Sequence, residues 1–351
     1  MKPVNKQQPP ARFPRRRTNS ILMLSLCITG LWGSSLVSAD PIERKICVWD
    51  PVGNNGPVTR LIKDLTPKAM SWGVRFKIDA YTDEKVAAND FKAGVCDAVV
   101  TTDLSVREFN QFTSTFSAVG GIRNDEELKT LMTAAASPKL SSLMRDKQYE
   151  IAGILPLGSV FMYVRDKSID RVERLQGRKM AVMNSDPVIA TMVRRIGGSA
   201  VPSSLASMAG QFNNGSVDII FAPAVAYNVM ELYKGIETGG GIVDYPLLHS
   251  SLQLTIRHES FPDGFGQHMR EYALTRFDSM MDVVKAAESE IPKNYWISIE
   301  EDRRSGYNDY MKASRIALRD EGYYAPKALT VMRKVRCKFE PTHSECATQD
   351  E

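Results

Sequence analysis

The stretch from Leu175 to Pro223 constrains the fold of this chain more than any other. Short apolar segments at 179–183, around Val201 and at 217–222 alternate with two segments of helical character. Apolar segments of this length, separated by helices, are typical of parallel strands. The pattern predicts a β-loop-α-β-α-β unit, in which the loops place a small ligand near helix N-termini.

The N-terminal segment has the features of an export signal. Residues 1–39 hold six cations and no acid, and an apolar segment at 21–36 precedes the small residues Val37-Ser38-Ala39. This arrangement predicts a signal peptide over residues 1–39 and a mature chain that begins at Asp40. A membrane anchor is the alternative, but the apolar segment is shorter than the ~20 residues that a span needs.

The leader also explains the basic charge of the whole chain. The formal net charge is +4, but without residues 1–39 the chain has 39 cations against 41 acids. No basic stripe or recognition motif indicates nucleic acid as a partner. No later apolar run is long enough to span a bilayer, so we expect a chain that is not membrane-spanning after signal cleavage and that lies in a Gram-negative-type periplasm.

Four cysteines follow the predicted leader. They are Cys47, Cys96, Cys337 and Cys346. An even number in an exported protein favours disulfides, and four cysteines allow three pairings. We favour Cys47–Cys96, which would join two neighbouring strands, and Cys337–Cys346, which flank a short turn. A zinc site is the alternative, but the spacing lacks a metal-binding pattern and only His343 lies near the second pair.

Hydrophobic periodicity predicts further strands and helices along the chain. The predicted strands are 45–49, 74–81, 96–102, 149–164 and 252–257. The predicted helices are 58–72, 83–93, one that begins after Asn124 as N-cap, 224–234, 264–287 and 300–321. Gly239–Gly241 is predicted to form a turn. Both halves of the chain are therefore of the β-α-β type.

Three short motifs carry a resemblance to a known family. They read L-x-G-x-K-M-x-V at 175–182, G-G-x-x-V-P at 197–202 and G-x-V-D at 215–218. Their order and spacing resemble the second lobe of periplasmic solute-binding proteins that serve TRAP-type transporters. The resemblance implies an α/β fold of periplasmic-binding-protein type II, with two doubly wound lobes and an interlobe cleft. Lobe I would comprise 40–155 and 253–351 with the C-terminal helices, and lobe II would be inserted as 156–252.

The resemblance also implies a function. It suggests a receptor that captures a small organic solute in the cleft and delivers it to membrane transporter subunits, without a cofactor. The alternative is a periplasmic accessory or sensor protein of the same fold that acts through a protein partner. An enzyme is disfavoured because the four histidines lack metal-binding spacing and the chain has no nucleophile elbow or P-loop.

The chain departs from the family at the position that usually binds a carboxylate. Ala181 stands where the family has an arginine on its strand, and the preceding segment 161–164 offers none. Arg107 and Arg123 are the nearest candidates to replace these cations, although surface arginine is the competing interpretation for both. The departure favours a less charged or more apolar ligand than a C4-dicarboxylate.

Polar and aromatic residues at the ends of predicted strands are the candidate ligand contacts. They are Trp49, Asp50, Asn54, Asn55, Thr101, Thr102, Ser159, Asn184, Ser185 and Tyr227. Loops after strands line the cleft in this architecture, so these side chains would face the solute. For the Asn, Asp, Ser and Thr residues, turn formation or helix capping is the competing interpretation.

Overall fold

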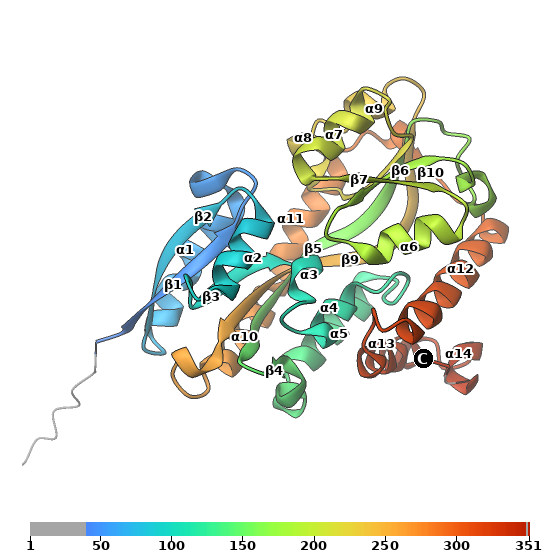
Figure 1. The fold of residues 1–351 in the computed structure, drawn as a ribbon. Coiled ribbons are helices and arrows are strands. Elements are labelled where there is room, and N and C mark those ends of the chain that lie inside the picture. Colours follow the sequence, from blue (N-terminus) through green and yellow to red (C-terminus); the bar gives the residue numbers. More distant parts are fainter. Residues whose placement is uncertain (1–39, 349) are drawn as a thin grey trace, which may run out of the picture. The chain divides into compact units, whose positions relative to one another are not determined.

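The computed structural model describes residues 40–348 and 350–351, and residues 40–351 form one compact unit (Figure 1). The predicted signal peptide lies outside the described residues. Within the described part of the chain, no helix combines the length and apolar character needed to cross a membrane.

One mixed sheet forms the centre of this unit. Its strands are β1 (Ile42–Trp49), β2 (Val74–Tyr81), β3 (Ala98–Thr102), β4 (Arg145–Asp146), β5 (Tyr149–Val164), β6 (Lys179–Met183), β7 (Ser199–Ser203), β8 (Ile219–Pro223), β9 (Gly241–Arg257) and β10 (Trp296–Ile297). The order is β2-β1-β3-β9-β5-β8-β6-β7. Parallel strands β2, β1 and β3 lie on one side, parallel strands β8, β6 and β7 on the other, and the antiparallel pair β5 and β9 joins them.

The two long strands β5 and β9 belong to both halves of the sheet. Residues 252–256 of β9 pair with β3, whereas residues 160–164 of β5 pair with β8. The sequence predicted β5 with its observed bounds, but predicted only residues 252–257 of β9 and placed Gly241 in a turn. The earlier part of β9 contains Pro246 and several polar residues that lower strand propensity, and its pairing with β5 overrides them.

The strands are irregular where they pass from one half of the sheet to the other. The register between β5 and β9 shifts at Pro156/Gly158 and again at Val160/Met162. Gly158 has φ +99°, and a Cβ atom at this position would lie 2.5 Å from Cγ1 of Val284. Only glycine meets both conditions, because side chains disfavour this backbone region. The crossing segment 157–159 is therefore bent by a specific sequence feature.

Helices cover both faces of the sheet. They are α1 (Pro57–Met70), α2 (Glu84–Lys92), α3 (Asp103–Val106), α4 (Gln111–Ser114), α5 (Asp125–Ala136), α6 (Pro187–Arg195), α7 (Leu205–Asn213), α8 (Ala226–Val229), α9 (Tyr233–Ile236), α10 (Phe265–Thr275), α11 (Phe277–Glu290), α12 (Glu301–Asp320), α13 (Pro326–Phe339) and α14 (Ser344–Thr348). Asn124 caps α5 as predicted, since its side chain accepts a hydrogen bond from the Glu127 amide. The predicted helices 224–234 and 264–287 are each divided into two, the second at Arg276.

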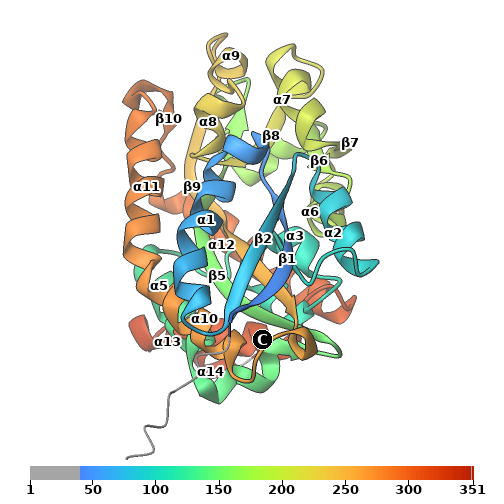
Figure 2. The same cartoon turned by 90° about the vertical axis from the view of Figure 1, so that its left-hand side faces the viewer.

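The half of the sheet that contains β1, β2 and β3 has a different core on each face. Apolar residues of α1 and α10 pack on one face, which Figure 2 shows with α1 beside β1 and β2. On the other face, Phe91 of α2 and Phe109 pack around Cys47 and Cys96. Alternate residues of β1 and β3 therefore belong to different cores, as the pleat of a strand requires.

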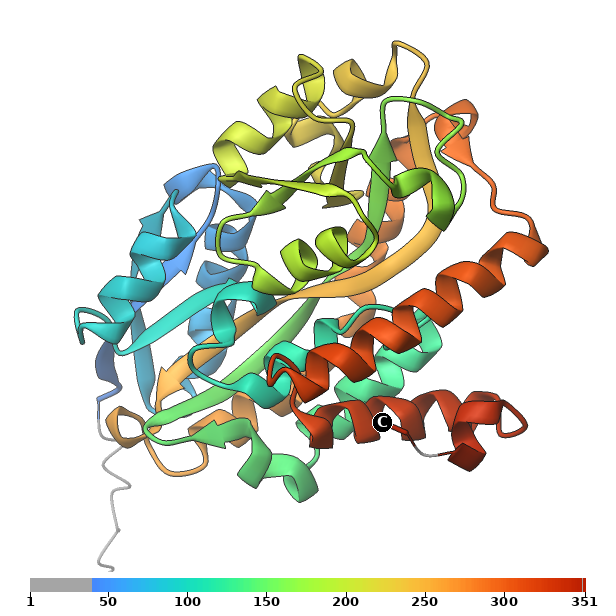
Figure 3. The same cartoon turned by 45° about the vertical axis from the view of Figure 1, so that its right-hand side comes forward.

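The C-terminal helices α12 and α13 pack onto the loop Val119–Gly121 (Figure 3). Arg315 of α12 donates a hydrogen bond to the Val119 carbonyl at 2.9 Å, and Arg336 of α13 donates to the Gly121 carbonyl at 2.6 Å. Both arginines are buried and pair with the Glu351 carboxylate, and Arg336 also pairs with Glu345. The fold thus holds a buried cluster of two arginines and two glutamates.

The structure contains the two disulfides that the sequence favoured. Cys47 of β1 is joined to Cys96, just before β3, and Cys337 is joined to Cys346. The first bond links neighbouring parallel strands inside the aromatic core. The second joins the residues that directly follow Arg336 and Glu345, which form a buried ion pair.

Replacing both Cys47 and Cys96 by alanine is expected to lower the free energy of unfolding by roughly 2–4 kcal/mol, because the bond closes a loop of 49 residues in the unfolded chain. The double alanine variant of Cys337 and Cys346 serves as the matched control, since its loop spans only 9 residues and the loss should be smaller. Urea unfolding measures both. Equal losses of stability in the two variants would show that the entropy of loop closure does not set the size of the loss.

Candidate functional site

A group of buried polar residues lies between the sheet and the short helices that follow β3. We call it the polar layer; its members are Thr101, Asp103, Thr113, Ser117, Ser251, Gln253 and Thr255, each at most 6% exposed. Gln253 of β9 is the register partner of Thr101 of β3, and its amide donates to the Thr113 carbonyl of α4. Because side chains alternate along a strand, Ser251, Gln253 and Thr255 project to the same face.

Several atoms of the polar layer lack hydrogen-bond partners. Five of its oxygens have none among the described residues: Thr101 Oγ1, Asp103 Oδ2, Thr113 Oγ1, Gln253 Oε1 and Thr255 Oγ1. Buried polar atoms in proteins are nearly always hydrogen-bonded, and an unpaired one costs about 1–3 kcal/mol. The concentration of such atoms in one place makes the polar layer the candidate site.

Asp103 is the charged member of the polar layer. Its Oδ1 accepts hydrogen bonds from the Ser250 hydroxyl and the Ser251 amide, both at 2.7 Å. The Ser117 hydroxyl lies beside the carboxylate, where it helps to lower the pKa of Asp103, and it is also 2.9 Å from the Ser114 carbonyl. Burial raises the pKa of the Asp103 carboxyl, against the hydrogen bonds that it accepts. The carboxylate is thus held in a place that disfavours its charge.

Two further carboxylates lie within electrostatic reach of Asp103. Burial raises the pKa of Asp186, the N-cap of α6, and the charge of Asp103 raises it further, whereas hydrogen bonding from Ile189 and the charge of Arg107 lower it. Burial and the Asp103 charge also raise the pKa of Glu84, which accepts hydrogen bonds from both the amide and the hydroxyl of Thr102. This end of the polar layer is therefore acidic.

Arg107 is the cation that acts on this acidic region. It is half-buried, donates to the Tyr323 carbonyl at 2.6 Å and lies 6.0 Å from the centre of the Tyr324 ring. Arg123, the other arginine considered from the sequence, instead pairs with Glu127 and Glu340. The structure thus gives Arg107, and not Arg123, a place beside the candidate site.

His249 lies next to these residues on β9, opposite Ser159 of β5. Its Nδ1 is 3.4 Å from the Ser159 hydroxyl, and its Nε2 is buried without a partner among the described residues. Burial lowers the pKa of the imidazole to about 4. The ring is therefore neutral at neutral pH.

The burial of the His249 imidazole should make the free energy of unfolding depend on pH. The folded-state pKa of about 4 lies below the ordinary imidazole value of 6.5, so the unfolded chain binds the proton more readily, and stability falls as pH drops through this range. We expect a contribution of roughly 2 kcal/mol to be lost between pH 7.5 and 5. Urea unfolding of the wild type and His249→Gln at both pH values isolates this term. If both proteins lost the same stability between these pH values, the assignment of the effect to His249 would be wrong.

The residues predicted in the loop after β1 are divided between core and surface. Trp49 is half-buried between two cores. Asp50 is fully buried, and its carboxylate accepts hydrogen bonds from the amides of Val52 and Thr59, both at 2.9 Å. Asn54 and Asn55 are exposed in a single turn of 3-10 helix. In this structure the Asp50 carboxylate organises its own turn.

The other predicted residues lie at the end of β3, within β5 and in the segments that follow β6 and β8. Thr101 is a member of the polar layer, and Thr102 binds Glu84. Ser159 contacts His249, as described above. Asn184 and Ser185 are exposed beside the buried Asp186. Tyr227 is 5% exposed and packs in the apolar core of the second half of the sheet.

Sequence reasoning did not single out Asp103, Gln253 or Ser251. Asp103 directly follows the predicted Thr101 and Thr102, so its position at the end of a strand was a usable signal. Gln253 and Ser251 lie in an alternating polar and apolar run, and that pattern ordinarily indicates a solvent-exposed face. Only the packing of α3 and α4 over this face shows that it is buried.

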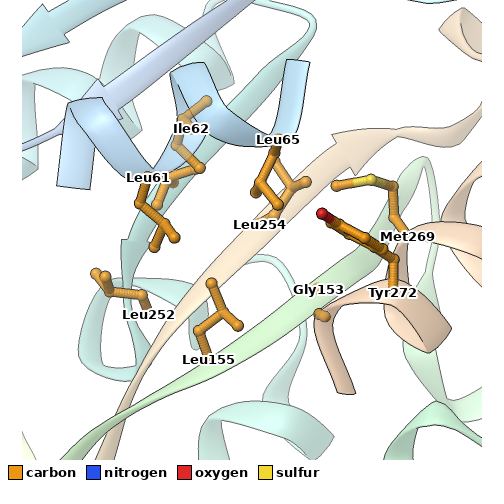
Figure 4. A pocket seen from close by; sticks show the side chains of 11 residues that line it. Leu61, Ile62, Leu65, Gly153, Leu155, Leu252, Leu254, Met269 and Tyr272 are labelled. Atoms are coloured by element: carbon orange, nitrogen blue, oxygen red, sulfur yellow. The ribbon is translucent and has the colours of Figure 1, made fainter. Parts of the chain in front are cut away.

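A small cavity lies on the opposite face of the sheet, between α1 and α10. Its volume is about 20 Å³, little more than one water molecule requires. Figure 4 shows apolar side chains around it, among them Leu61, Leu252 and Leu254. Leu252 and Leu254 alternate with Ser251 and Gln253 along β9, so the cavity and the polar layer are on different faces. The cavity is too small and too apolar to hold a polar solute.

Comparison with known proteins gives the family. A family model described as solute-binding protein AdeT 1/2 matches residues 57–351. The chain belongs to this family of solute-binding proteins. A relative, the probable solute-binding protein AdeT1 of Acinetobacter baumannii, is 36% identical over 304 residues, which are 87% of this chain and 100% of that protein. The family is thus one of solute-binding proteins and not of enzymes.

Solved structures of TRAP periplasmic solute-binding proteins share the two-lobe α/β fold of this AdeT 1/2 family member. One from Ralstonia eutropha H16 with bound (S)-2-acetolactate has a TM-score of 0.69 at 13% identity, covering 84% of this chain and 99% of its own. One from Shewanella oneidensis with bound succinate has a TM-score of 0.67 at 12% identity, with the same coverage. The fold expected from the sequence motifs is confirmed.

Proposed function

We propose that this protein is a periplasmic receptor that binds a small organic solute between two lobes and delivers it to a membrane transporter. The polar layer is the observation that carries the proposal, because a ligand that supplies hydrogen bonds would stabilise its unpartnered oxygens. The TRAP proteins of similar fold, with bound acetolactate and succinate, support a solute of small organic type. The predicted leader supports the periplasmic location.

The lobes would be residues 40–155 with 253–351, and residues 156–252. The register shifts and Gly158 lie beside these boundaries on the two long strands, where a bend would let the lobes separate. Asp103 belongs to the first lobe and Asp186 to the second, and their charges influence each other. A solute between them would be enclosed when the lobes close, as in hinge-type binding proteins.

Among the residues predicted from the sequence, Thr101, Thr102 and Ser159 are the ones we assign to the solute site. Asn184 and Ser185 would contact the solute from the loop after β6, next to Asp186. Asp50 and Tyr227 would act indirectly, through the turn after β1 and the core under β8. A binding assay on alanine variants of these residues separates the two groups.

Thermal unfolding of the chain from Asp40 to Glu351 with a panel of organic acids, amino acids, amines, sugars and aromatic compounds tests the proposal. A ligand present at 100 times its dissociation constant should add about 2.7 kcal/mol, which raises the melting temperature visibly. A shift with at least one compound class supports a solute receptor. A flat panel would count against it and favour the accessory or sensor function through a protein partner.

A further inference from the structure

We propose that the solute is a small organic cation that carries N–H donors, such as a primary amine, and not an organic acid. This inference rests on the proposed receptor function and specifies the chemistry of its ligand. It follows from two independent observations on the polar layer, namely which hydrogen-bonding groups are unpartnered and which charges lie beside them.

Two of the five unpartnered atoms of the polar layer require a donor. Gln253 uses both amide protons, one toward the Thr113 carbonyl and one toward the Ser251 hydroxyl, each at 3.2 Å. The Thr113 carbonyl can only accept, which fixes the orientation of the Gln253 amide. The atom that remains, Gln253 Oε1, can therefore only accept, and so can Asp103 Oδ2.

The remaining unpartnered atoms of the layer are hydroxyl oxygens, which accept or donate as needed. They belong to Thr101, Thr113 and Thr255. Thr101 and Gln253 are register partners, Gln253 donates to the Ser251 hydroxyl, and the Ser251 amide donates to Asp103, so these groups are neighbours. A carboxylate ligand has no proton to offer these atoms, whereas an ammonium group offers three.

The charges around the layer also favour a cation. The charge of Asp103 acts on both Glu84 and Asp186, and Arg107 is the cation that acts on Asp186. Ala181 is buried in the core of the second lobe, so the strand position that carries an arginine in the related family supplies no positive charge here. A bound cation would relieve the repulsion among the buried carboxylates, and a bound anion would add to it.

An organic ammonium fits these groups better than a metal ion. Among the described residues, no group of three or more His, Cys, Asp or Glu side chains could hold a metal. The hydroxyl and amide acceptors around Asp103 are neutral and dispersed along β3, β9 and α4, which suits a ligand that spreads several N–H donors and some apolar surface.

Calorimetric titration with compounds of equal carbon number but opposite charge tests the inference. The pairs are putrescine with succinate and butylamine with butyrate, and 1,4-butanediol is the neutral reference. We expect the amines to bind at least tenfold more tightly than the acids. Tighter binding of the acids would overturn the cation assignment and leave the receptor function intact. If neither these pairs nor the wider panel binds, both proposals fall together.

Variants locate the selectivity in the carboxylates of the polar layer and beside it. Asp186→Asn removes charge but keeps the side-chain oxygen that caps α6, so it should fold and lose most of the preference for amines over the neutral diol. Asp64→Asn removes an exposed charge on α1 and is the matched control, with unchanged selectivity expected. Equal selectivity in Asp186→Asn, Asp103→Asn and the wild type would overturn the inference.

Discussion

Asp103→Asn is expected to weaken amine binding by two to three orders of magnitude. Removing one partner of a buried, hydrogen-bonded charge pair typically costs 2–5 kcal/mol, and the Asp103 carboxylate is 1% exposed with one oxygen free for a ligand. The asparagine oxygen can still accept the hydrogen bonds from Ser250 and Ser251. The fold around the site should therefore persist, and calorimetry at low ionic strength measures the loss.

The same substitution is expected to stabilise the ligand-free protein by about 1–3 kcal/mol at neutral pH, because it removes a buried charge with an unpaired oxygen. Burial raises the folded-state pKa of Asp103, so the penalty exists above that pKa and disappears as pH falls toward the ordinary aspartate range. The stability difference between Asp103→Asn and wild type should shrink accordingly, which urea unfolding at several pH values measures.

Asp64→Asn is the control for both measurements, since Asp64 is exposed on α1. It should change binding less than threefold and stability by less than about 0.5 kcal/mol. If Asp103→Asn bound amines as well as Asp64→Asn does, Asp103 would not contact the solute. If it were less stable than the wild type at pH 7, the carboxylate would instead be a structural element.

Arg336→Met is expected to lower the free energy of unfolding by about 3–5 kcal/mol, because it leaves buried carboxylates without a full set of partners. The Arg336 guanidinium is 1% exposed and forms hydrogen bonds with Glu345 at 2.9 and 2.6 Å and with Glu351 at 2.7 Å. Arg315 remains paired with Glu351 at 2.7 Å, but its distance to Glu345 is longer, at 4.0 Å. Glu345 is thus the carboxylate that loses most of its hydrogen bonds in the variant.

Two comparisons test this interpretation of the C-terminal cluster. Arg178→Met removes an exposed pair with Asp166, at 3.5 Å, and should cost no more than about 1 kcal/mol. Adding Glu345→Leu to Arg336→Met should recover part of the lost stability, because the unpaired charge is removed as well. A loss below 1 kcal/mol in Arg336→Met would show that solvent reaches the cluster.

The sequence predicted the fold because local patterns and tertiary structure agree over most of the chain. Strands β2, β5 and β6 have their predicted bounds, since each is a continuous or alternating apolar run between turn residues. The start of β9 was missed, because Pro246 and the polar residues around it have little intrinsic strand preference. Its pairing with β5 is a long-range property that a local pattern does not contain.

The candidate site was predictable only in part. The strand ends at Thr101 and Thr102 indicate where a ligand would lie in this architecture. That Ser251 and Gln253 are buried depends on α3 and α4, which are each only four residues long and have weak periodicity. The acidity of the site depends on Glu84 and Asp186 approaching Asp103 from distant parts of the chain. Spacing in the sequence carries no such information.

The central claim is that a solute held between the two lobes completes the polar layer. A crystal structure of the protein with the tightest-binding compound of the panel, whatever its charge, tests it most directly. We expect the compound to lie between the lobes, with a polar atom about 3 Å from Asp103 Oδ2 or Gln253 Oε1. A compound bound elsewhere, with both of these oxygens still unpaired, would contradict the claim.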